Sequence, residues 1–344
     1  MRRPILTELP PPPPDKTGWP WTEETPPLPE SMPDGSPWPR ISIVTPSYNQ
    51  GQFIEETIRS VLLQGYPNLE YIIMDGGSTD DSVEIIKKYE PWLAYWVSEK
   101  DRGQSHAINK GWKKATGEII AYINSDDIYI LGAFEITASH FVIESNISAL
   151  VGKIGYINSD SRLIGISAKP YMPCEGACDL SLADPDLWFL PQPSSFWRRY
   201  ALEKVGMYVQ ENLHYTMDRE LFYRISKIGR IALIDMPLAS FRNHGENKSI
   251  SDTLLMYNED AVALRYLDDG NFYHRLIRWR NARWWLARGY FFLSGRGDNK
   301  SDVLWKLYLA AWYRPKYLVK KNFYFRFFRS FIPEKIWGMI KKYR

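Results

Sequence analysis

Two stretches decide the fold: "ISIVTPSYN" (residues 41–49) and "LEYIIMDGG" (residues 69–77) are short apolar runs that end in polar residues. A helical stretch near residues 52–64 separates them, and the same alternation continues to "GEIIAYINS" (residues 117–125). Strands that alternate with helices predict a mainly parallel α/β sheet covered by helices on both faces. Ligands bind such sheets at the carboxyl ends of the strands, where these polar residues stand.

The charge of the chain is unevenly spread. The net charge over 344 residues is +3, which is too small to indicate a nucleic-acid partner, and we expect none. Residues 271–344, however, hold eighteen Lys and Arg against three acids, interleaved with Trp, Tyr, Phe and Leu. This pattern is typical of helices that lie in a bilayer interface. We expect a helical C-terminal region, residues 251–344, which either attaches to an anionic membrane surface or packs on the core.

The N-terminal segment, residues 1–39, has too many prolines for helix or sheet and predicts an extended arm. This arm is either a strap over the domain or a proline-rich ligand for a partner. Neither a signal peptide nor a spanning helix is indicated, so we expect a cytoplasmic protein, peripheral on the membrane at most. The two cysteines, Cys174 and Cys178, cannot form a disulfide framework, and we expect reduced thiols.

Two adjacent carboxylates, Asp126 and Asp127, follow the last apolar run of the alternating series. One interpretation is structural: Asp127 caps a following helix and Asp126 lies in a solvated turn. The other is a site for Mg²⁺ or Mn²⁺, because these hard cations take one or two carboxylates and complete their coordination with water and substrate phosphates. The position at a strand end favours the metal site.

Three segments together resemble the family 2 glycosyltransferases, whose nucleotide-sugar-binding fold is called GT-A. They are "ISIVTPSYNQGQFIEETIRSVLLQGYPNLEYIIMDGGSTDDS" (residues 41–82), "DRGQSHAINKG" (residues 101–111) and "GEIIAYINSDD" (residues 117–127). The resemblance covers roughly residues 40–245, with five motifs in the family's order. It implies a Rossmann-like, mainly parallel mixed sheet in residues 40–250, divided into a nucleotide-sugar half (40–128) and an acceptor half (129–250).

The resemblance also implies a reaction. It predicts an inverting, metal-dependent enzyme that moves a sugar from a nucleotide diphosphate sugar to a hydroxyl of a glycan or lipid-linked acceptor, in cell-surface polysaccharide synthesis. The residues implied at the donor are Thr45, Pro46, Tyr48, Asp75, Asp101, Arg102, Asn124 and Ser125. The first three lie under the base, and Asp75 hydrogen-bonds it. Asp101 holds the nucleotide or donor sugar, and Arg102 meets the diphosphate or else forms a surface salt bridge.

The implied metal site centres on Asp126 as principal ligand, with Asp127 as second ligand or orienting neighbour. Asn124 stands where many family members have the first Asp, which puts a direct metal contact from this residue in doubt. His244, in "FRNHGENKS" (residues 241–249), stands where some members place a histidine near the metal or diphosphate. The alternative for His244 is a structural role.

The implied general base is Asp218, in "HYTMDRELFYRI" (residues 214–225), which resembles a family element with Asp at the start of a helix. A plain amphipathic helix with Asp218 at its amino end is the structural alternative. Glu220 is the fallback base, although a helix turns it about 200° away from Asp218. Gln192 and Ser194 are expected on the acceptor side.

Two rival functions remain at this stage. A nucleotidyltransferase of similar fold would need a Gly-rich basic loop after the first strand, and "TPSYNQGQF" (residues 45–53) has no Lys or Arg. A non-catalytic, membrane-associated sugar-nucleotide-binding protein is favoured only by Asn124. A dehydrogenase is disfavoured because no G-x-G-x-x-G follows a strand.

Overall fold

The computed structural model describes residues 3–245, 253–264, 267, 269–294, 300–315 and 318. The chain forms two compact units. The sheet unit comprises Met1–Leu180 and Leu187–His244, and the helical unit comprises Ser181–Asp186 and Gly245–Arg344. The boundary that the sequence predicts at residue 250 lies outside the described residues. The short segment Ser181–Asp186 was not expected in the helical unit.

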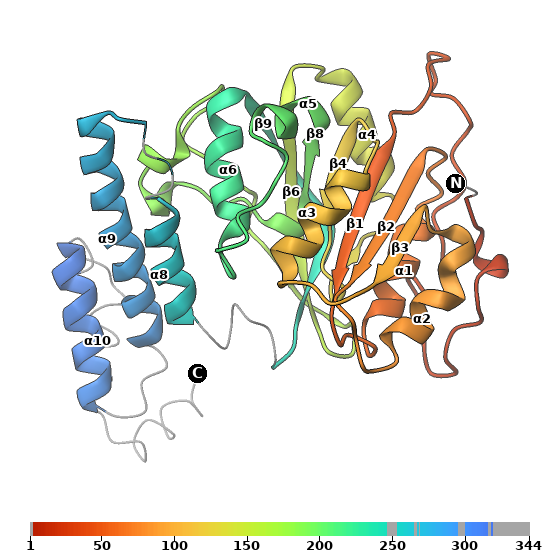
Figure 1. Cartoon of the computed structure of the whole chain (residues 1–344), viewed down its shortest axis with the longest axis horizontal. Coiled ribbons are helices and arrows are strands. Elements are labelled where there is room, and N and C mark those ends of the chain that lie inside the picture. The colour runs from red at the N-terminus through yellow and green to blue at the C-terminus, as the bar shows by residue number, and fades with distance from the viewer. Residues whose placement is uncertain are drawn as a thin grey trace, which may run out of the picture. The chain divides into compact units, whose positions relative to one another are not determined.

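The sheet unit contains nine strands in the order β3-β2-β1-β4-β8-β6-β9-β5, with β7 paired to β6 (Figure 1). The first four strands form a parallel set in which β1 lies between β2 and β4: β1 (Ile41–Ser47), β2 (Leu69–Asp75), β3 (Tyr95–Ser98) and β4 (Ile119–Tyr122). Every residue of β1 and β2 is buried, as expected of parallel strands covered on both faces. The predicted α/β alternation is confirmed.

Helices connect the strands of the sheet unit. They are α1 (Ile54–Leu62), α2 (Ser82–Tyr89), α3 (Gln104–Lys114), α4 (Ala133–Ile143), α5 (Arg199–Lys204) and α6 (Met217–Ile228). Short 3₁₀ turns add η1 (Leu6–Glu8), η2 (Glu90–Trp92), η3 (Leu180–Leu182), η4 (Pro185–Leu187) and η5 (Gln192–Ser194). Helix α3 packs closely on β1, because a Cβ built on Gly111 would lie 2.4 Å from Val44 Cγ1. Glycine therefore sets how near this helix comes to the sheet.

The second half of the sheet is mixed. Its strands are β5 (Ile128–Tyr129), β6 (Ile147–Asn158), β7 (Leu163–Ile166), β8 (Ser195–Arg198) and β9 (Arg230–Asn243). Strand β8 runs antiparallel to both β4 and β6, whereas the long strands β6 and β9 run parallel to each other. The β6–β7 pair is a hairpin. Within the sheet, the β4–β8 pairing is therefore the strand pairing that joins the second half to the first.

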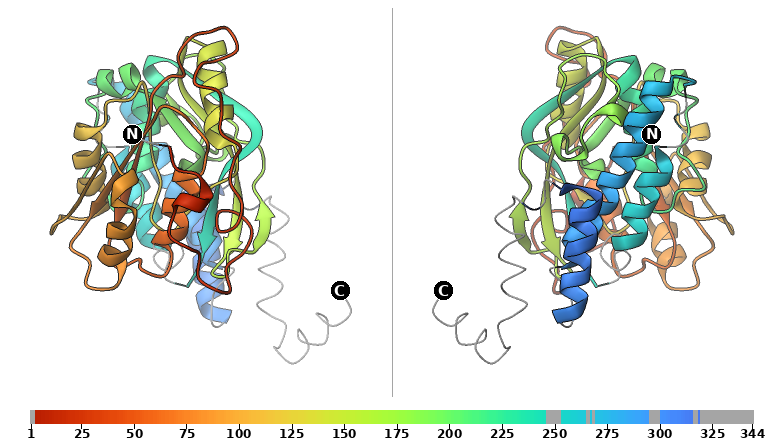
Figure 2. Two further views of the ribbon diagram at one scale, coloured as in Figure 1. Left: turned by 90° about the vertical axis from the view of Figure 1, so that its right-hand side faces the viewer. Right: turned by 90° about the vertical axis from the view of Figure 1, so that its left-hand side faces the viewer.

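The N-terminal arm is bound to the sheet unit (Figure 2). Arg59, on α1 and fully buried, donates hydrogen bonds to the carbonyl oxygens of Pro10 (2.9 Å), Pro20 (3.0 Å) and Trp21 (2.9 Å). Its guanidinium also lies 5.3 Å from the centre of the Trp21 ring. A buried cation needs such acceptors, and the arm supplies three of them beside the Tyr89 hydroxyl, to which Arg59 Nη1 also donates (3.1 Å).

The two cysteines correct one expectation. Cys174 and Cys178 are joined in a disulfide, with their Cα atoms 6.4 Å apart, so the prediction of two reduced thiols was wrong for this structure. The three residues of irregular backbone between them allow the Cα atoms to approach within the usual disulfide range. Composition alone could not show that the chain turns back at this point.

The helical unit contains α8 (Thr253–Ala263), α9 (Phe272–Ser294) and α10 (Lys300–Tyr313), with α9 between the other two (Figure 1). The segment Ser181–Asp186 is held by buried polar groups of this unit. Arg314 pairs with both Asp184 and Asp186, and Asn281 Nδ2 donates to the carbonyl oxygens of Ser181 and Ala183. Among the described helices, none has the length and hydropathy needed to cross a bilayer.

Candidate active site

The carboxyl ends of β1, β2 and β3 are tied together by their backbones. Ser47 at the end of β1 stands opposite Asp75 at the end of β2. The amide of Gly76 donates to Ser47 O (2.8 Å), and the amide of Glu99, just after β3, donates to Asp75 O (3.0 Å). The loops that carry the predicted donor residues therefore start from one edge of the sheet.

Asp75 organises the turn that follows β2. Its Oδ2 accepts hydrogen bonds from the Gly77 amide (3.0 Å), the Ser78 amide (2.9 Å) and Ser98 Oγ (2.6 Å). Its Oδ1 accepts one from Ser78 Oγ at 2.5 Å. This buried carboxylate is thus engaged on both oxygens by the chain itself, and its contact with a base stays a prediction.

The end of β1 presents one exposed ring. Thr45 and Pro46 are buried, and Thr45 Oγ1 lies 3.0 Å from the Tyr71 hydroxyl. Tyr48 is 60% exposed, which is unusual for so large a ring beside a sheet edge. Asn49 adopts a positive φ of 51° and accepts the Thr79 amide at 2.8 Å, so this loop is fastened to the turn after β2.

Asp101 and Arg102 follow β3 and have different surroundings. Asp101 Oδ1 accepts the Gly103 amide at 2.7 Å, and a Cβ built on Gly76 would lie 2.9 Å from Asp101 Oδ2. Asp101 therefore packs against the turn after β2. Arg102 is exposed and pairs with Glu211, with Nη2–Oε2 at 2.6 Å and Nε–Oε2 at 3.1 Å. This is the surface salt bridge of the alternative interpretation, and contact with a diphosphate stays a prediction.

The polar groups of the loop after β4 differ in their burial and in their hydrogen-bond partners. Asn124 Oδ1 accepts from Gln104 Nε2 at 2.6 Å, so this oxygen is already engaged. Ser125 is buried, and its carbonyl oxygen accepts from Thr57 Oγ1 (3.0 Å). Asp127 is fully buried and accepts the Arg242 amide at 2.9 Å. Burial, followed by the charge of Asp126, raises the pKa of Asp127 well above its ordinary value.

Asp126 is the carboxylate of this loop that reaches solvent. Its side chain is 19% exposed, and its Oδ2 lies 3.0 Å from His244 Nε2. The His244 ring packs against Phe53, with the ring centres 4.9 Å apart. The structure thus brings together two of the three predicted metal ligands. Asp127 is turned inward and has the geometry of an orienting neighbour.

Arg242 stabilises the loop that carries Asp126 through buried hydrogen bonds. Fully buried near the end of β9, it donates from Nε to Asp126 O (2.7 Å), from Nη1 to Ser161 Oγ (2.8 Å) and from Nη2 to Glu56 Oε2 (3.0 Å). Glu56 is also buried, and the guanidinium lies 4.8 Å from the centre of the Phe53 ring. This ion pair joins α1, the β6–β7 turn and the loop that carries Asp126.

Asp218 lies in the first turn of α6, where its Oδ1 accepts the Arg219 amide at 2.9 Å. Burial raises the pKa of the phenol of Tyr122, the last residue of β4, well above its ordinary value, and the charge of Asp218 raises it further. A shared site for Asp218 and the loop after β4 stays a prediction.

Glu220, the fallback base, is buried and paired with Arg224 at 2.7 Å. Arg224 also donates to the carbonyl oxygens of Val205 (2.7 Å) and Tyr208 (2.8 Å), so the pair anchors the loop before α6. Gln192 and Ser194, predicted on the acceptor side, are buried as well. Gln192 Nε2 donates to Tyr122 O (2.8 Å), and Ser194 Oγ donates to Lys153 O (2.5 Å). Their acceptor role stays a prediction.

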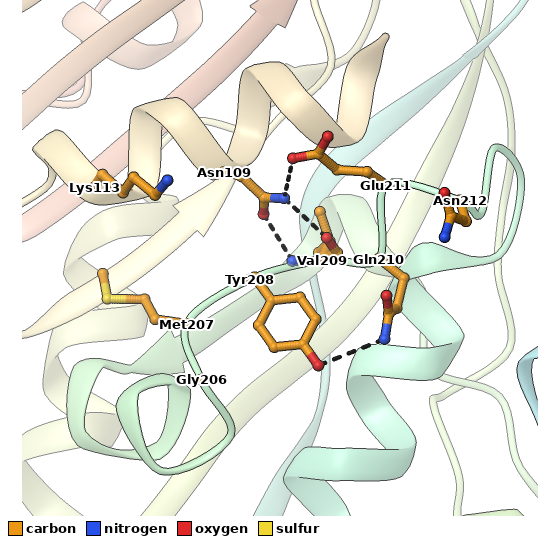
Figure 3. Close-up of a pocket in the computed structure, with 9 residues that line it drawn as sticks. All are labelled: Asn109, Lys113, Gly206, Met207, Tyr208, Val209, Gln210, Glu211 and Asn212. Atoms are coloured by element: carbon orange, nitrogen blue, oxygen red, sulfur yellow. Dashed lines mark hydrogen bonds between the residues drawn. The ribbon is translucent and has the colours of Figure 1, made fainter. Parts of the chain in front are cut away.

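A polar hollow of about 320 Å³ lies between α3 and residues 206–212 (Figure 3). Asn109 fastens its wall, since Nδ2 donates to Val209 O (2.9 Å) and Oδ1 accepts the Val209 amide (2.8 Å). Tyr208 and Gln210 also line it, and Glu211, which pairs with Arg102, stands at its edge. The sequence analysis did not predict this hollow.

The sequence of the chain matches a known protein family. Residues 42–206 match the family model described as glycosyl transferase family 2. Residues 42–206 form a family 2 glycosyltransferase domain. The predicted family and enzyme class are thereby confirmed, while the roles of individual site residues remain predictions.

Relatives of this glycosyltransferase include an uncharacterized glycosyltransferase of Nostoc sp., 26% identical over 68% of this chain and 74% of its own. WfgD of Escherichia coli, described as a UDP-Glc:alpha-D-GlcNAc-diphosphoundecaprenol beta-1,3-glucosyltransferase, is 34% identical over 35% of this chain and 48% of its own. The mannosyltransferase PcManGT from Pyrobaculum calidifontis, solved with GDP-Man and Mn²⁺, has a TM-score of 0.54 at 18% identity, covering 83% of this chain and 84% of its own. This likeness confirms the predicted fold.

The family motifs did not point to Arg242, Glu56 or Glu211, which position the predicted site of the transferase. One signal for Arg242 was present, because a charged residue in the strand "IALIDMPLASFRN" (residues 231–243) must find a buried partner or face solvent. Nothing in the sequence indicated that this partner is Glu56, 186 positions away.

Proposed function

We propose that this glycosyltransferase is metal-dependent and inverting, and that it moves a sugar from a nucleotide diphosphate sugar to a hydroxyl of a glycan or lipid-linked acceptor in polysaccharide synthesis. The observation that carries the proposal is the placement of Asp126, partly exposed and 3.0 Å from His244, in the loop that leaves the same edge of the sheet as the predicted donor residues. It supports a metal site beside the donor site, and we propose that Asp218, at the start of α6, faces the same centre. A transfer reaction needs this arrangement, because the leaving group and the attacking hydroxyl meet at a single carbon.

The residues present fit a divalent cation. Asp126 offers a partly exposed carboxylate and His244 an imidazole nitrogen 3.0 Å from it. Within the described part of the chain, no group of three or more His, Cys, Asp or Glu residues could enclose a metal. A site with one or two protein ligands is what Mg²⁺ or Mn²⁺ uses when substrate phosphates and water complete the shell. When bound, the cation would supply charge that stabilises the leaving diphosphate.

Asp218 is proposed as the general base. Its carboxylate would accept the proton of the acceptor hydroxyl as the new bond forms between that oxygen and the anomeric carbon. The bond from the anomeric carbon to the diphosphate oxygen breaks on the opposite face, which inverts the configuration. Glu220 is unsuited to this role because Arg224 already pairs with it in the interior. Tyr48, exposed at the end of β1, is proposed to stack on the base.

The comparisons support the substrate classes. WfgD is named for a UDP-sugar donor and a diphosphoundecaprenol-linked acceptor, and PcManGT was solved with GDP-Man and Mn²⁺. Both proteins are named with a nucleotide diphosphate sugar, and we propose a donor of this class for the present chain. The lipid-linked acceptor is proposed from the name of WfgD, and Mn²⁺ as the cation is proposed from the complex of PcManGT.

The proposal is tested by melting the protein with UDP, GDP, dTDP or CMP, each with and without Mn²⁺. A ligand that binds only the folded form raises the melting temperature, and we expect one nucleotide to do so in the presence of Mn²⁺. The matching nucleotide sugar is then tested for transfer that stops on addition of EDTA. Binding without turnover would favour the non-catalytic alternative, and pyrophosphate-dependent formation of nucleoside triphosphate would favour the nucleotidyltransferase.

A further inference from the structure

Helix α10 has two unlike faces. Leu307 and Ala310, with Arg314 just after the helix, are three and four positions apart and form a buried stripe. On the other side stand Trp305, Tyr308 and Trp312 with the same spacing, and these are 59%, 52% and 62% exposed. We call these three residues the aromatic stripe. It lies on the side of α10 opposite Leu307 and Ala310, which pack in one buried cluster with Ala287 of α9.

Packing against the described part of the chain does not explain the aromatic stripe. Single exposed apolar residues are common, but contiguous exposed aromatic rings mark an interaction surface. The rings lie against one another: Trp305 and Tyr308 are 5.4 Å apart at 20°, and Tyr308 and Trp312 are 6.1 Å apart at 28°. The three rings thus form one continuous aromatic surface, and Trp and Tyr are enriched where proteins meet a lipid interface.

Charge points to the same partner. Residues 316–344, which follow α10 in the sequence, hold nine Lys and Arg against one acid. Several described Arg side chains between residues 271 and 315 interact with acids or aromatic rings of the helical unit itself. Arg278 and Arg314 are buried in ion pairs with acids of the helical unit, and the guanidinium of Arg280 lies 4.2 Å from the centre of the Trp284 ring. The attraction to anionic lipid therefore falls mainly on the sequence beyond α10.

We propose that the aromatic stripe of α10 inserts into the interface of an anionic membrane. Trp and Tyr are the residues found at this depth, because they join an apolar ring to a polar N–H or O–H. The inference deepens the proposed function and rests on it for its biological sense, since a lipid-linked acceptor is presented at a membrane surface. It narrows the predicted attachment region from residues 271–344 to one helix face.

The test is co-sedimentation of the full chain with vesicles of phosphatidylcholine and phosphatidylglycerol in a 7:3 ratio. We expect the wild type to pellet with these vesicles and to remain in the supernatant with pure phosphatidylcholine. The triple variant Trp305→Ala, Tyr308→Ala, Trp312→Ala is expected to lose about tenfold in partition coefficient. The matched control is Ile143→Ala with Ile164→Ala, which removes exposed apolar side chains from the sheet unit and should bind as the wild type does.

Two further measurements keep the result clear. Equal melting temperatures would show that the triple variant is folded, and quenching of wild-type tryptophan fluorescence by brominated phosphatidylglycerol reports insertion without any variant. Equal pelleting of wild type and triple variant, or no quenching, would overturn the proposal. Asp218→Asn is expected to bind vesicles normally while it loses transfer, so failure of the membrane proposal and failure of the proposed reaction can be told apart.

Discussion

The two halves of the sheet differ in what holds them together. In the parallel half, β1 to β4, the β1–β2 and β2–β3 pairs join strands that are consecutive in the sequence, and the polar loops share one edge by topology. In the mixed half, β5 to β9, the pairings other than the β6–β7 hairpin span longer stretches of chain, and the buried ion pair of Arg242 with Glu56 of α1 ties β9 to the first half of the chain. The comparison teaches that the parallel half offers the predicted donor groups and the carboxylate Asp126, while the mixed half positions them and offers His244 and the predicted base.

The largest effect is expected at the parallel half. Asp126→Asn should lower kcat/KM for transfer by about 10³-fold, because it removes the exposed carboxylate proposed to hold the cation against the diphosphate. Steady-state kinetics at several Mn²⁺ concentrations would measure this loss. Asp235→Asn is the matched control, since Asp235 is an exposed acid on β9 paired with Lys153, and it should leave transfer unchanged. Full activity in Asp126→Asn would remove the metal site from this loop.

Breaking the brace of the mixed half should cost stability. Arg242→Met leaves Glu56 buried without its cation, and we expect the free energy of unfolding in urea to fall by about 3–5 kcal/mol. Adding Glu56→Gln to this variant should recover part of the loss, because the unpaired charge is then gone. A loss below about 1 kcal/mol would mean that the pair does not hold the two halves together.

Glu70, near the amino end of β2, predicts how stability depends on pH. Burial tends to raise the pKa of Glu70, but hydrogen bonds from Ser42 and Thr116 and the charge of Arg40 outweigh it, so the pKa lies below its ordinary value of 4.5. A lowered pKa in the folded state stabilises the protein at neutral pH, and this stability is lost as the pH falls below about 4.5. Glu70→Gln should cost about 1–3 kcal/mol at pH 7 and should flatten the fall of melting temperature between pH 6 and 3.5. An unchanged pH slope would contradict this assignment.

The smallest effect is expected at the exposed pair between the halves. Arg102→Gln and Glu211→Gln should each change stability by less than about 1 kcal/mol, because exposed ion pairs contribute little. The KM for the donor distinguishes the two roles predicted for Arg102, contact with the diphosphate and a surface salt bridge. If the guanidinium leaves Glu211 for the diphosphate, Arg102→Gln should raise the donor KM by about tenfold and Glu211→Gln should not. An equal KM in both variants would leave Arg102 as a surface salt bridge.

The sequence predicted the parallel half well because its information is local. The runs that end at Ser47 and Asp75 show their strands by apolar length and their loops by polar residues. It also predicted that Asp126 and His244 share a site, but only through resemblance to a family. It could not predict that Asp127 is turned inward by the Arg242 amide, or that Glu56 pairs with Arg242, because these contacts depend on how distant strands pack.

The helical unit shows the same limit. Composition predicted its helices, and a basic aromatic surface was expected along the whole region from residue 271. In the described helices, Arg278 and Arg314 are instead buried partners of Asp269, Asp184 and Asp186, two of which belong to the segment Ser181–Asp186. A count of charges does not distinguish a cation that holds a fold together from one that faces a partner.

The central claim is that Asp126 and Asp218 act at one catalytic centre. A double-mutant cycle on kcat/KM with Asp126→Asn, Asp218→Asn and the double variant tests it most directly, because residues that act as a unit are not additive. We predict that the double variant transfers no more slowly than the slower single variant. Losses that multiply, as for two independent sites, would contradict the account.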